Sequence, residues 1–246
     1  MFRKISVVLV MVTMVIISCD DPGCHSSQNE QDNRYYARAA KLIMVEPSDS
    51  QEAKDFVKYG YELSEKYDTP VIVRTTTKLA HSQSAVELCD RVEVEDKTYE
   101  RDPKKYVMMP AMAIGKHVKV EQRHLALVAY AETSALNEVE DNGSRIGVIV
   151  SGTTHLYAHE ALGNAVNYLK LGMVYPLPEQ KIRDFAASVD TLWVIEELDP
   201  FIENHCKALG LAVEGKSVFP ICGEFSQRMI AEKLGKEIQR IIYRNR

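Results

Sequence analysis

Cysteine is sparse in this sequence, and none of its five cysteines forms a CxxC pair. An odd, scattered set of this kind suits reduced thiols in the cytoplasm better than a disulfide framework. There is also no CxxCxxCxxxC run, so an iron–sulfur cluster held in the ferredoxin manner is not expected. The cysteines are Cys19, Cys24, Cys89, Cys206 and Cys222.

Several short functional motifs are missing as well. No GxGxxG, GxxxxGK[ST] or GxSxG segment occurs, so dinucleotide-binding, P-loop and serine-hydrolase interpretations have no support. Nor is basic charge in excess, because the formal net charge is -5. The sequence therefore gives no electrostatic reason to expect nucleic acid as a partner.

The apolar run at the amino end admits two interpretations. Arg3 and Lys4 precede the apolar segment Ile5–Ile17, and Cys19 would pass as the first residue of a lipoprotein. The run is shorter than the roughly 20 residues that a membrane span needs. The second interpretation is a buried parallel strand, Val12–Cys19, because β-branched runs are typical of strands covered on both faces. The dense polar loop and periodic pattern that follow favour the strand, while export through Cys19 stays as the alternative.

Short apolar strands alternate with amphipathic helices, which predicts an α/β fold with parallel sheets and right-handed crossovers. A stretch that is first charged and then rich in Met and Pro interrupts this pattern. We therefore divide the chain into residues 1–89, a connector with a long helix at 90–144, and a second α/β unit at 145–246. The predicted strands are 12–19, 43–46, 71–75, 146–150, 167–171, 192–195 and 211–213. The predicted helices are 32–40, one capped by Ser48 or Asp49, 117–136, 154–162, 178–187, 201–209 and 227–243.

The strongest chemical feature is the polar run DDPGCHSSQNEQDNR, which directly follows the first predicted strand. In open α/β sheets, ligands bind at loops that follow the carboxyl ends of strands. Uncharged polar side chains can orient a polar substrate by hydrogen bonds, and the planar fork of arginine suits a carboxylate. We predict that this loop lines a substrate pocket; the simpler interpretation is a solvated loop with a helix cap. The candidate substrate-binding residues are His25, Ser26, Gln28, Asn29, Gln31 and Arg34, and no catalytic or metal-binding residue is assigned.

Two other sequence patterns give weaker evidence for a functional site. His155 and His159 share one helical face, as in helical zinc sites, but no third ligand has suitable spacing, so a metal site is not expected there. Glu196 and Glu197 are adjacent at a predicted strand and point to opposite faces, which argues against an acid–base pair.

Long stretches of the sequence resemble one enzyme family. The run DDPGCHSSQNEQDNRYYARAAKLIMVEPSDSQEAKDF is similar to the large subunit of indolepyruvate:ferredoxin oxidoreductases, whose hallmark is DDPxxHSSQNEQDxR followed by EPSDSQEAK. The resemblance continues through TPVIVRTTTKLAHSQ, KLGMVYPLPEQKI and VIEELDPFIE, in the family's order. It covers residues 14–230, with Cys24 where many relatives carry methionine.

The resemblance implies an α/β chain with the carboxyl-terminal part of a thiamine-diphosphate pyrimidine-type domain, followed by a transketolase-C-like parallel-sheet domain. It implies an oxidoreductase that converts an aryl 2-oxoacid such as indolepyruvate, with coenzyme A and ferredoxin, into aryl-acetyl-CoA, CO2 and reduced ferredoxin. The complete enzyme would use thiamine diphosphate, Mg2+ and 4Fe-4S clusters and would include a β subunit.

The sequence departs from that family in extent. The start of the first domain is missing, and with it the glutamate that the family places at the thiamine aminopyrimidine to form the reactive ylid. A GDG-x-N type segment and a cysteine-rich tail do not occur either. We therefore expect a fragment that holds none of these cofactors and is inactive alone, in the cytoplasm, with neither nucleic acid nor membrane as partner. The alternative is a non-catalytic assembly subunit or remnant.

Overall fold

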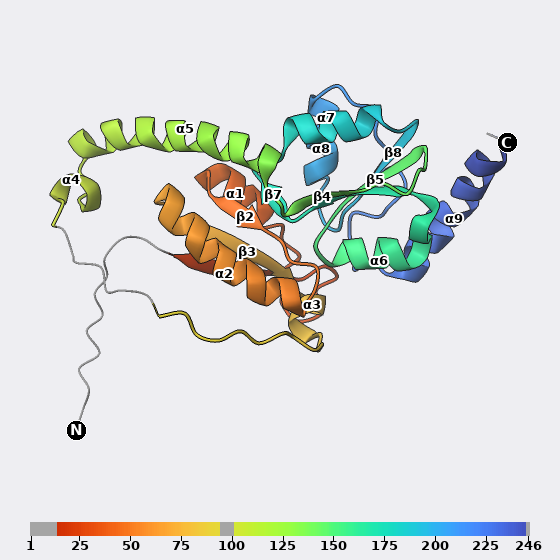
Figure 1. Cartoon of the computed structure of the whole chain (residues 1–246), viewed down its shortest axis with the longest axis horizontal. Coiled ribbons are helices and arrows are strands. Elements are labelled where there is room, and N and C mark those ends of the chain that lie inside the picture. Colours follow the sequence, from red (N-terminus) through yellow and green to blue (C-terminus); the bar gives the residue numbers. More distant parts are fainter. Residues whose placement is uncertain (1–13, 94–100, 245–246) are drawn as a thin grey trace.

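The computed structural model describes residues 14–93 and 101–244, which fold into two four-stranded sheets with helices packed against them (Figure 1). Most neighbouring strands within each sheet are parallel. The predicted α/β class is confirmed.

The first sheet has the strand order β1-β3-β2-β7. The first three of these strands are parallel, and β7 runs antiparallel to β2. Because the register sets Asp20 beside Thr76, the carboxyl ends of β1 and β3 lie at the same edge. The strands are β1 (Val15–Asp20), β2 (Ile43–Val45), β3 (Val71–Thr76) and β7 (Met173–Tyr175).

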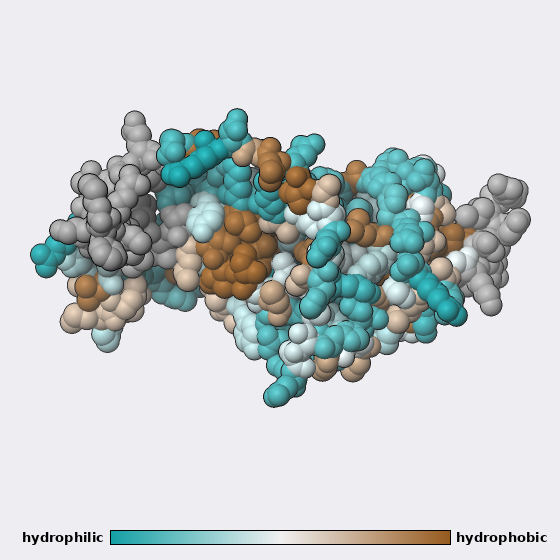
Figure 2. Space-filling view, turned by 90° about the horizontal axis from the view of Figure 1, so that it is seen from below, coloured by the Kyte–Doolittle hydropathy of each residue, from teal (hydrophilic) through white to brown (hydrophobic). Residues whose placement is uncertain are grey.

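β1 is an edge strand that pairs only with β3 in the described part of the chain. Ile17 is 54% exposed and Cys19 is exposed as well. Figure 2 shows hydrophobic residues gathered in a patch on the half of the molecule that contains this sheet. The predicted strand is confirmed from Val15 onward, and residues 12 and 13 lie outside the described range. The expected full burial is wrong, because a parallel strand is buried on both faces only where other elements cover both.

Three helices accompany the first sheet: α1 (Arg34–Ala40), α2 (Ser50–Tyr67) and α3 (Thr77–His81). Asp49 is the N-cap of α2, as one of the two predicted caps, and its carboxylate accepts a hydrogen bond from the amide of Glu52 at 2.8 Å. The Glu52 carboxylate in turn accepts from the amide of Ser48 at 2.7 Å, which completes a reciprocal cap.

The connector contains two helices, α4 (Pro103–Tyr106) and α5 (Pro110–Thr133). The long helix predicted at 117–136 therefore starts earlier and ends sooner. Proline at the first position of a helix costs no hydrogen bond, so the Met- and Pro-rich run forms the first turns of α5 instead of a loop. In Figure 1, α5 extends well beyond the sheet that it covers at its carboxyl end.

The second sheet has the order β4-β6-β5-β8, with β4 antiparallel to β6 and the other strands parallel. Its helices lie on both faces (Figure 1). The strands are β4 (Asn137–Glu140), β5 (Ile146–Ser151), β6 (Asn167–Leu171) and β8 (Thr191–Ile195). The helices are α6 (Gly152–Leu162), the short 3-10 helix η1 (Gly163–Ala165), α7 (Glu179–Ala187), α8 (Phe201–Ala208) and α9 (Gln227–Arg244).

The two sheets share a core. One hydrophobic cluster contains Met44 and Ile72 from the first sheet together with Ile149 and Leu169 from the second. At Gly172 the chain passes from β6 to β7, and a Cβ there would overlap the carbonyl oxygen of Leu136. The division at residues 89 and 144 stays a prediction.

Two strands have no counterpart among the sequence predictions, and one predicted strand needs correction. Asn137–Glu140 is a short, charged edge strand whose Val139 is 52% exposed. Met173–Tyr175 was also missed, because three residues before a proline give no periodicity. The strand predicted at 211–213 is wrong: only the next residue, Glu214, forms an isolated bridge, with Trp193.

All five cysteines are free, and Cys19 lies in register with Thr75 within the first sheet. Among the helices of residues 14–93 and 101–244, none is long and apolar enough to cross a membrane.

Candidate functional site

The carboxyl ends of the two sheets face each other. The hydroxyl oxygens of Thr76, at the end of β3, and Thr153, in the first turn of α6, are 3.4 Å apart. Gly152 has a φ of +52°, and a Cβ there would overlap the carboxylate of Glu46. Loops from both sheets therefore converge on one junction, which is where α/β proteins commonly bind ligands.

Arg74 lies at the centre of the first sheet's edge. Its Nε donates to Asp20 at 2.6 Å and its Nη1 donates to Glu46. Burial lowers the pKa of Arg74, but the two carboxylates outweigh burial and raise it. One oxygen of each carboxylate and the second terminal nitrogen of Arg74 are buried without a hydrogen-bond partner in the described structure. These three atoms could still form hydrogen bonds to a ligand at this edge of the sheet.

Arg34 locks the end of the polar loop. Its Nε and Nη2 bind the Asp32 carboxylate at 2.9 and 2.6 Å, and its Nη1 donates to Glu196 at 2.5 Å. Its side chain is 1% exposed and stacks over the ring of Phe201, with the guanidinium carbon 5.2 Å from the ring centroid. The carboxylates that the fork engages thus belong to the chain itself. A substrate-binding role for Arg34 stays a prediction.

Asp21 organises the middle of the loop through hydrogen bonds to its carboxylate. The Asp21 carboxylate accepts hydrogen bonds from the amides of His25, Ser26 and Ser27 at 2.6–3.1 Å and from the hydroxyl of Thr77 at 2.6 Å. The hydrogen bond from Thr77 is the largest of the causes that hold the Asp21 pKa well below its usual range. The loop is therefore built around internal anions.

Glu30 joins this loop to a distant segment. Its Oε1 accepts from the amide of Gly23 at 2.6 Å and from the amide of Gly223 at 2.8 Å. Because these partners come from both ends of the chain, Glu30 fixes the loop against the segment that precedes α9.

The predicted substrate-binding residues lie on the outer side of the loop. His25, Ser26, Gln28 and Asn29 are exposed, and Gln31 is half-buried. The Asn29 amide donates to Gln31 at 2.8 Å, so these two act as a pair. The loop presents uncharged polar groups outward while its carboxylates point inward, and contact of the outer residues with a substrate stays a prediction.

Lys78 was missed by the sequence analysis. It follows β3, and its ammonium group binds the carboxylate of Glu224 at 3.1 Å and the carbonyl of Phe225 at 2.9 Å, over the ring of Tyr157. The imidazole of His25 lies 3.7 Å from the same Glu224. The sequence does place Lys78 directly after a predicted buried strand, in the run TTTK, and that position could have indicated a site residue.

Glu196 and Glu197 follow β8 and bind different partners. The Glu196 carboxylate accepts from the amides of Ile202 and Glu203 as well as from Arg34. Glu197 accepts from the amide of Phe225 at 2.6 Å. Burial raises the pKa of Glu197 to about 7, so part of this carboxyl is protonated at neutral pH.

Replacing Asp21 with alanine is expected to loosen the loop, because three backbone amides lose their acceptor. Hydrogen exchange at His25, Ser26 and Ser27 should become clearly faster in the variant. Asp141→Ala is a matched control, since Asp141 is exposed and accepts only from Gly143 among the described contacts. Unchanged protection at the three loop amides would contradict the anchoring role of Asp21.

The histidine pair on α6 shows no metal-site geometry. The rings of His155 and His159 are 6.0 Å apart, and His159 lies 3.4 Å from Glu140. Burial, reinforced by the charge of Lys170, lowers the pKa of His155 to about 4. Within the described residues, no group of three or more His, Cys, Asp or Glu could hold a metal ion.

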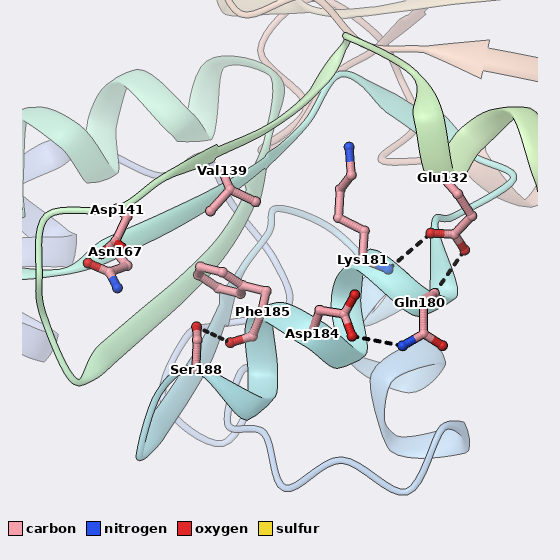
Figure 3. A pocket seen from close by; sticks show the side chains of 9 residues that line it. All are labelled: Glu132, Val139, Asp141, Asn167, Gln180, Lys181, Asp184, Phe185 and Ser188. Atoms are coloured by element: carbon pink, nitrogen blue, oxygen red, sulfur yellow. Dashed lines mark hydrogen bonds between the residues drawn. The ribbon is translucent and has the colours of Figure 1, made fainter.

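The cavity drawn in Figure 3 lies at the opposite, amino-terminal edge of the second sheet and has a volume of about 540 Å³. Its polar side chains serve the chain itself: Glu132 accepts from the amides of Gln180 and Lys181, and Asp184 accepts from the Gln180 side chain.

Two facing sheets, with a charge-anchored loop at their carboxyl edges, define the class of this chain as an α/β protein whose candidate ligand site lies at the junction of its sheets. The model of the family described as "Pyruvate flavodoxin/ferredoxin oxidoreductase, thiamine diP-bdg" matches residues 4–147, and the chain belongs to this family. Within it, the chain is similar to the indolepyruvate oxidoreductase subunit IorA, which confirms the resemblance seen in the sequence.

Three relatives show the extent of the match. The IorA of Archaeoglobus fulgidus is 42% identical over 208 residues, and that of Methanothermobacter thermautotrophicus is 40% identical over 219 residues. The IorA of Pyrococcus horikoshii is 32% identical over 252 aligned residues, which cover 96% of this chain. The alignments cover 82%, 84% and 96% of this chain but only 33%, 35% and 39% of the three relatives.

Solved structures share the fold. A 2-oxoglutarate:ferredoxin oxidoreductase from Magnetococcus marinus, with 2-oxoglutarate, coenzyme A and succinyl-CoA bound, has a TM-score of 0.64 at 17% identity. It is matched over 92% of this chain and 48% of its own. A split-gene transketolase, described as an inactive β4 tetramer, has a TM-score of 0.53 at 15% identity, over 92% of this chain and 67% of its own.

The described residues do not fit a complete thiamine diphosphate site. Such a site needs oxygen ligands for a divalent ion at the diphosphate and a free carboxylate at the aminopyrimidine. Four buried carboxylates at the junction are instead paired with Arg34 or Arg74, and Glu197 accepts from the amide of Phe225. No group of three or more His, Cys, Asp or Glu that could hold a metal ion occurs in residues 14–93 and 101–244. No chemical step is therefore assigned to the cofactor on these residues.

Proposed function

We propose that this chain supplies the loop-bearing part of an indolepyruvate or arylpyruvate:ferredoxin oxidoreductase and that it is inactive alone. The observation that carries the proposal is the polar loop at the junction of the two sheets. Its carboxylates are buried on Arg34, on Thr77 and on backbone amides, while its uncharged polar side chains face outward. Membership of the oxidoreductase family supports a role for this loop in binding a 2-oxoacid.

In this proposal, His25, Ser26, Gln28 and Asn29 orient the 2-oxoacid by hydrogen bonds, with Gln31 positioning Asn29. Neutral donors and acceptors bind a 2-oxoacid without stabilising its carboxylate as strongly as a cation would. The carboxylate can therefore still leave as CO2. The complete enzyme would convert one arylpyruvate, one coenzyme A and two oxidised ferredoxins into aryl-acetyl-CoA, CO2, two reduced ferredoxins and a proton. Thiamine diphosphate supplies the carbanion chemistry of that reaction when bound.

The remaining parts of the reaction belong to partners in this proposal. The chain spans 33–39% of the length of the relatives compared above, so the β subunit, Mg2+, 4Fe-4S clusters, ferredoxin and coenzyme A are assigned to the assembled enzyme. A cytoplasmic location is proposed with them, because four of the five free cysteines are exposed.

The first test is an assay of the purified chain with indolepyruvate, thiamine diphosphate, Mg2+, coenzyme A and an electron acceptor. No turnover is expected, because the chain spans only 33–39% of the length of the relatives and its described residues include no group that could hold a metal ion at the diphosphate. Measurable turnover by the chain alone would show that the incompleteness argument is wrong.

The second test uses a chimera in which residues 14–230 replace the matching segment of the Archaeoglobus fulgidus IorA, assembled with its β subunit. The chimera is expected to reduce ferredoxin with an arylpyruvate and coenzyme A. His25→Ala should raise the KM for the 2-oxoacid roughly tenfold, as expected for losing a hydrogen bond to a charged ligand. His117→Ala is the matched control, since His117 is 73% exposed on α5. A folded chimera without turnover, or equal effects of both variants, would contradict the proposal.

A further inference from the structure

A second cavity, of about 410 Å³, lies between α1, α5, β7 and α8, and Phe201 is one of the residues that line it. Nothing in the function proposed above uses it. We propose that this cavity binds a small aromatic carboxylate. Its volume falls in the range of roughly 300–1,000 Å³ that is typical of small-molecule sites.

One wall of the cavity suits a flat ring. The rings of His124 and Tyr175 are stacked, with centroids 5.7 Å apart and an interplanar angle of 16°. Leu177 and Phe201 are 5% and 6% exposed and complete an apolar surface. Aromatic side chains favour stacked or edge contacts with another ring, so this wall selects an aromatic body over a flexible polar one.

The other wall carries a free guanidinium. Arg38 lines the cavity, and its side chain has no hydrogen-bond or ion-pair partner among the described residues. Its charge acts on both sides of the cavity: burial raises the pKa of Tyr175 and Arg38 opposes that rise, whereas burial lowers the pKa of His205 and Arg38 adds to that decrease. An unpartnered guanidinium beside an apolar wall favours a carboxylate, which it can bind with two parallel hydrogen bonds.

Two buried ring nitrogens lack partners at the same place. His124 Nδ1 and His205 Nε2 have no hydrogen-bond partner in the described structure, although both residues line the cavity. A buried polar atom without a partner costs free energy that a ligand atom can recover. Carboxylate oxygens can accept from either ring when that nitrogen carries its proton.

The acidic neighbours limit the charge of the ligand. Glu179 lies 3.9 Å from His205 Nε2 and is 52% exposed at the rim, while Glu121 is already paired with Lys41. On α7, Arg183 donates to the carbonyl of Leu209. With one free guanidinium and one rim carboxylate, the cavity suits a single negative charge and disfavours a phosphate dianion or a cation.

The proposal is tested on the full chain by titration with phenylacetate, followed through the imidazole C–H signals of His124 and His205. Saturable shifts are expected with a Kd of about 1 mM or tighter. Phenylacetamide, which has the same shape without the charge, should bind at least about tenfold more weakly because it lacks the charge-assisted pair. No saturable shift with phenylacetate, or equal binding of the acid and the amide, would overturn the proposal.

Variants separate the role of Arg38 from general charge. Arg38→Gln should weaken phenylacetate binding by about tenfold or more, and Arg38→Lys should restore part of the affinity because it keeps the charge without the fork. Arg228→Gln is the control, since Arg228 is 84% exposed on α9 and pairs only with Glu232 among the described residues. If Arg38→Gln binds as the unmodified chain does, the assignment is wrong. Arg38 is exposed, so its replacement is not expected to disturb the fold. Unchanged NMR signals away from the cavity will show that the variant is folded.

Discussion

Replacing Arg34 with methionine is expected to lower the free energy of unfolding by about 3–5 kcal/mol, the usual cost of leaving a buried ion pair without one partner. Arg34 is 1% exposed and neutralises both Asp32 and Glu196, whose side chains are each 2% exposed. Methionine fills much of the volume but leaves two buried carboxylates without a counter-ion. Urea-induced unfolding at pH 7, followed by circular dichroism, measures the change.

Two further variants show that charge, and not size, is responsible. Adding Glu196→Gln to Arg34→Met should recover part of the loss, because one of the two unpaired charges is removed. Arg145→Gln removes an arginine whose partner Asp190 is 55% exposed, so its cost should stay below about 1 kcal/mol. Equal destabilisation by Arg34→Met and Arg145→Gln would contradict the locking role of Arg34.

Strand and helix positions follow from local patterns, and they were largely predictable. Val71–Thr76 begins with the β-branched run VIV and Ile146–Ser151 contains VIV, and both segments are strands. Edge elements were not predictable in the same way. Asn137–Glu140 is stabilised by pairing with β6, which is a tertiary contact that its own four residues do not reveal.

The loop shows why a candidate site is harder to predict than a fold. Its composition predicts polarity at the carboxyl end of a strand, but it does not show which side chains turn inward. Arg34 was grouped with His25 by sequence proximity, yet its partner Glu196 is 162 positions away. Partners at that separation leave no spacing signal, so the division into anchoring and outward-facing residues comes from the structure alone.

The stability of the chain is also expected to fall between pH 4.5 and 7 through Glu197. Burial raises the pKa of this carboxyl from its ordinary value of 4.5 to about 7, so the folded state binds a proton that the unfolded state releases in this window. The stabilisation is complete below pH 4.5 and is lost as the pH rises through 7. At roughly 1.4 kcal/mol per pKa unit, a shift from 4.5 to about 7 gives a full effect of about 3.5 kcal/mol.

Glu197→Gln isolates this effect, because glutamine keeps an acceptor for the amide of Phe225 but cannot ionise. The variant should match the unmodified chain near pH 5 and be about 2–3 kcal/mol more stable at pH 8. All other titrating groups, including the buried His155, are common to both proteins and cancel in the difference. Glu232→Gln on α9, where Glu232 is 62% exposed, should show no such dependence on pH. A difference between Glu197→Gln and the unmodified chain that is the same at pH 5 and pH 8 would mean that Glu197 is ionised throughout. The junction of the two sheets would then hold a full negative charge in place of a partly protonated carboxyl.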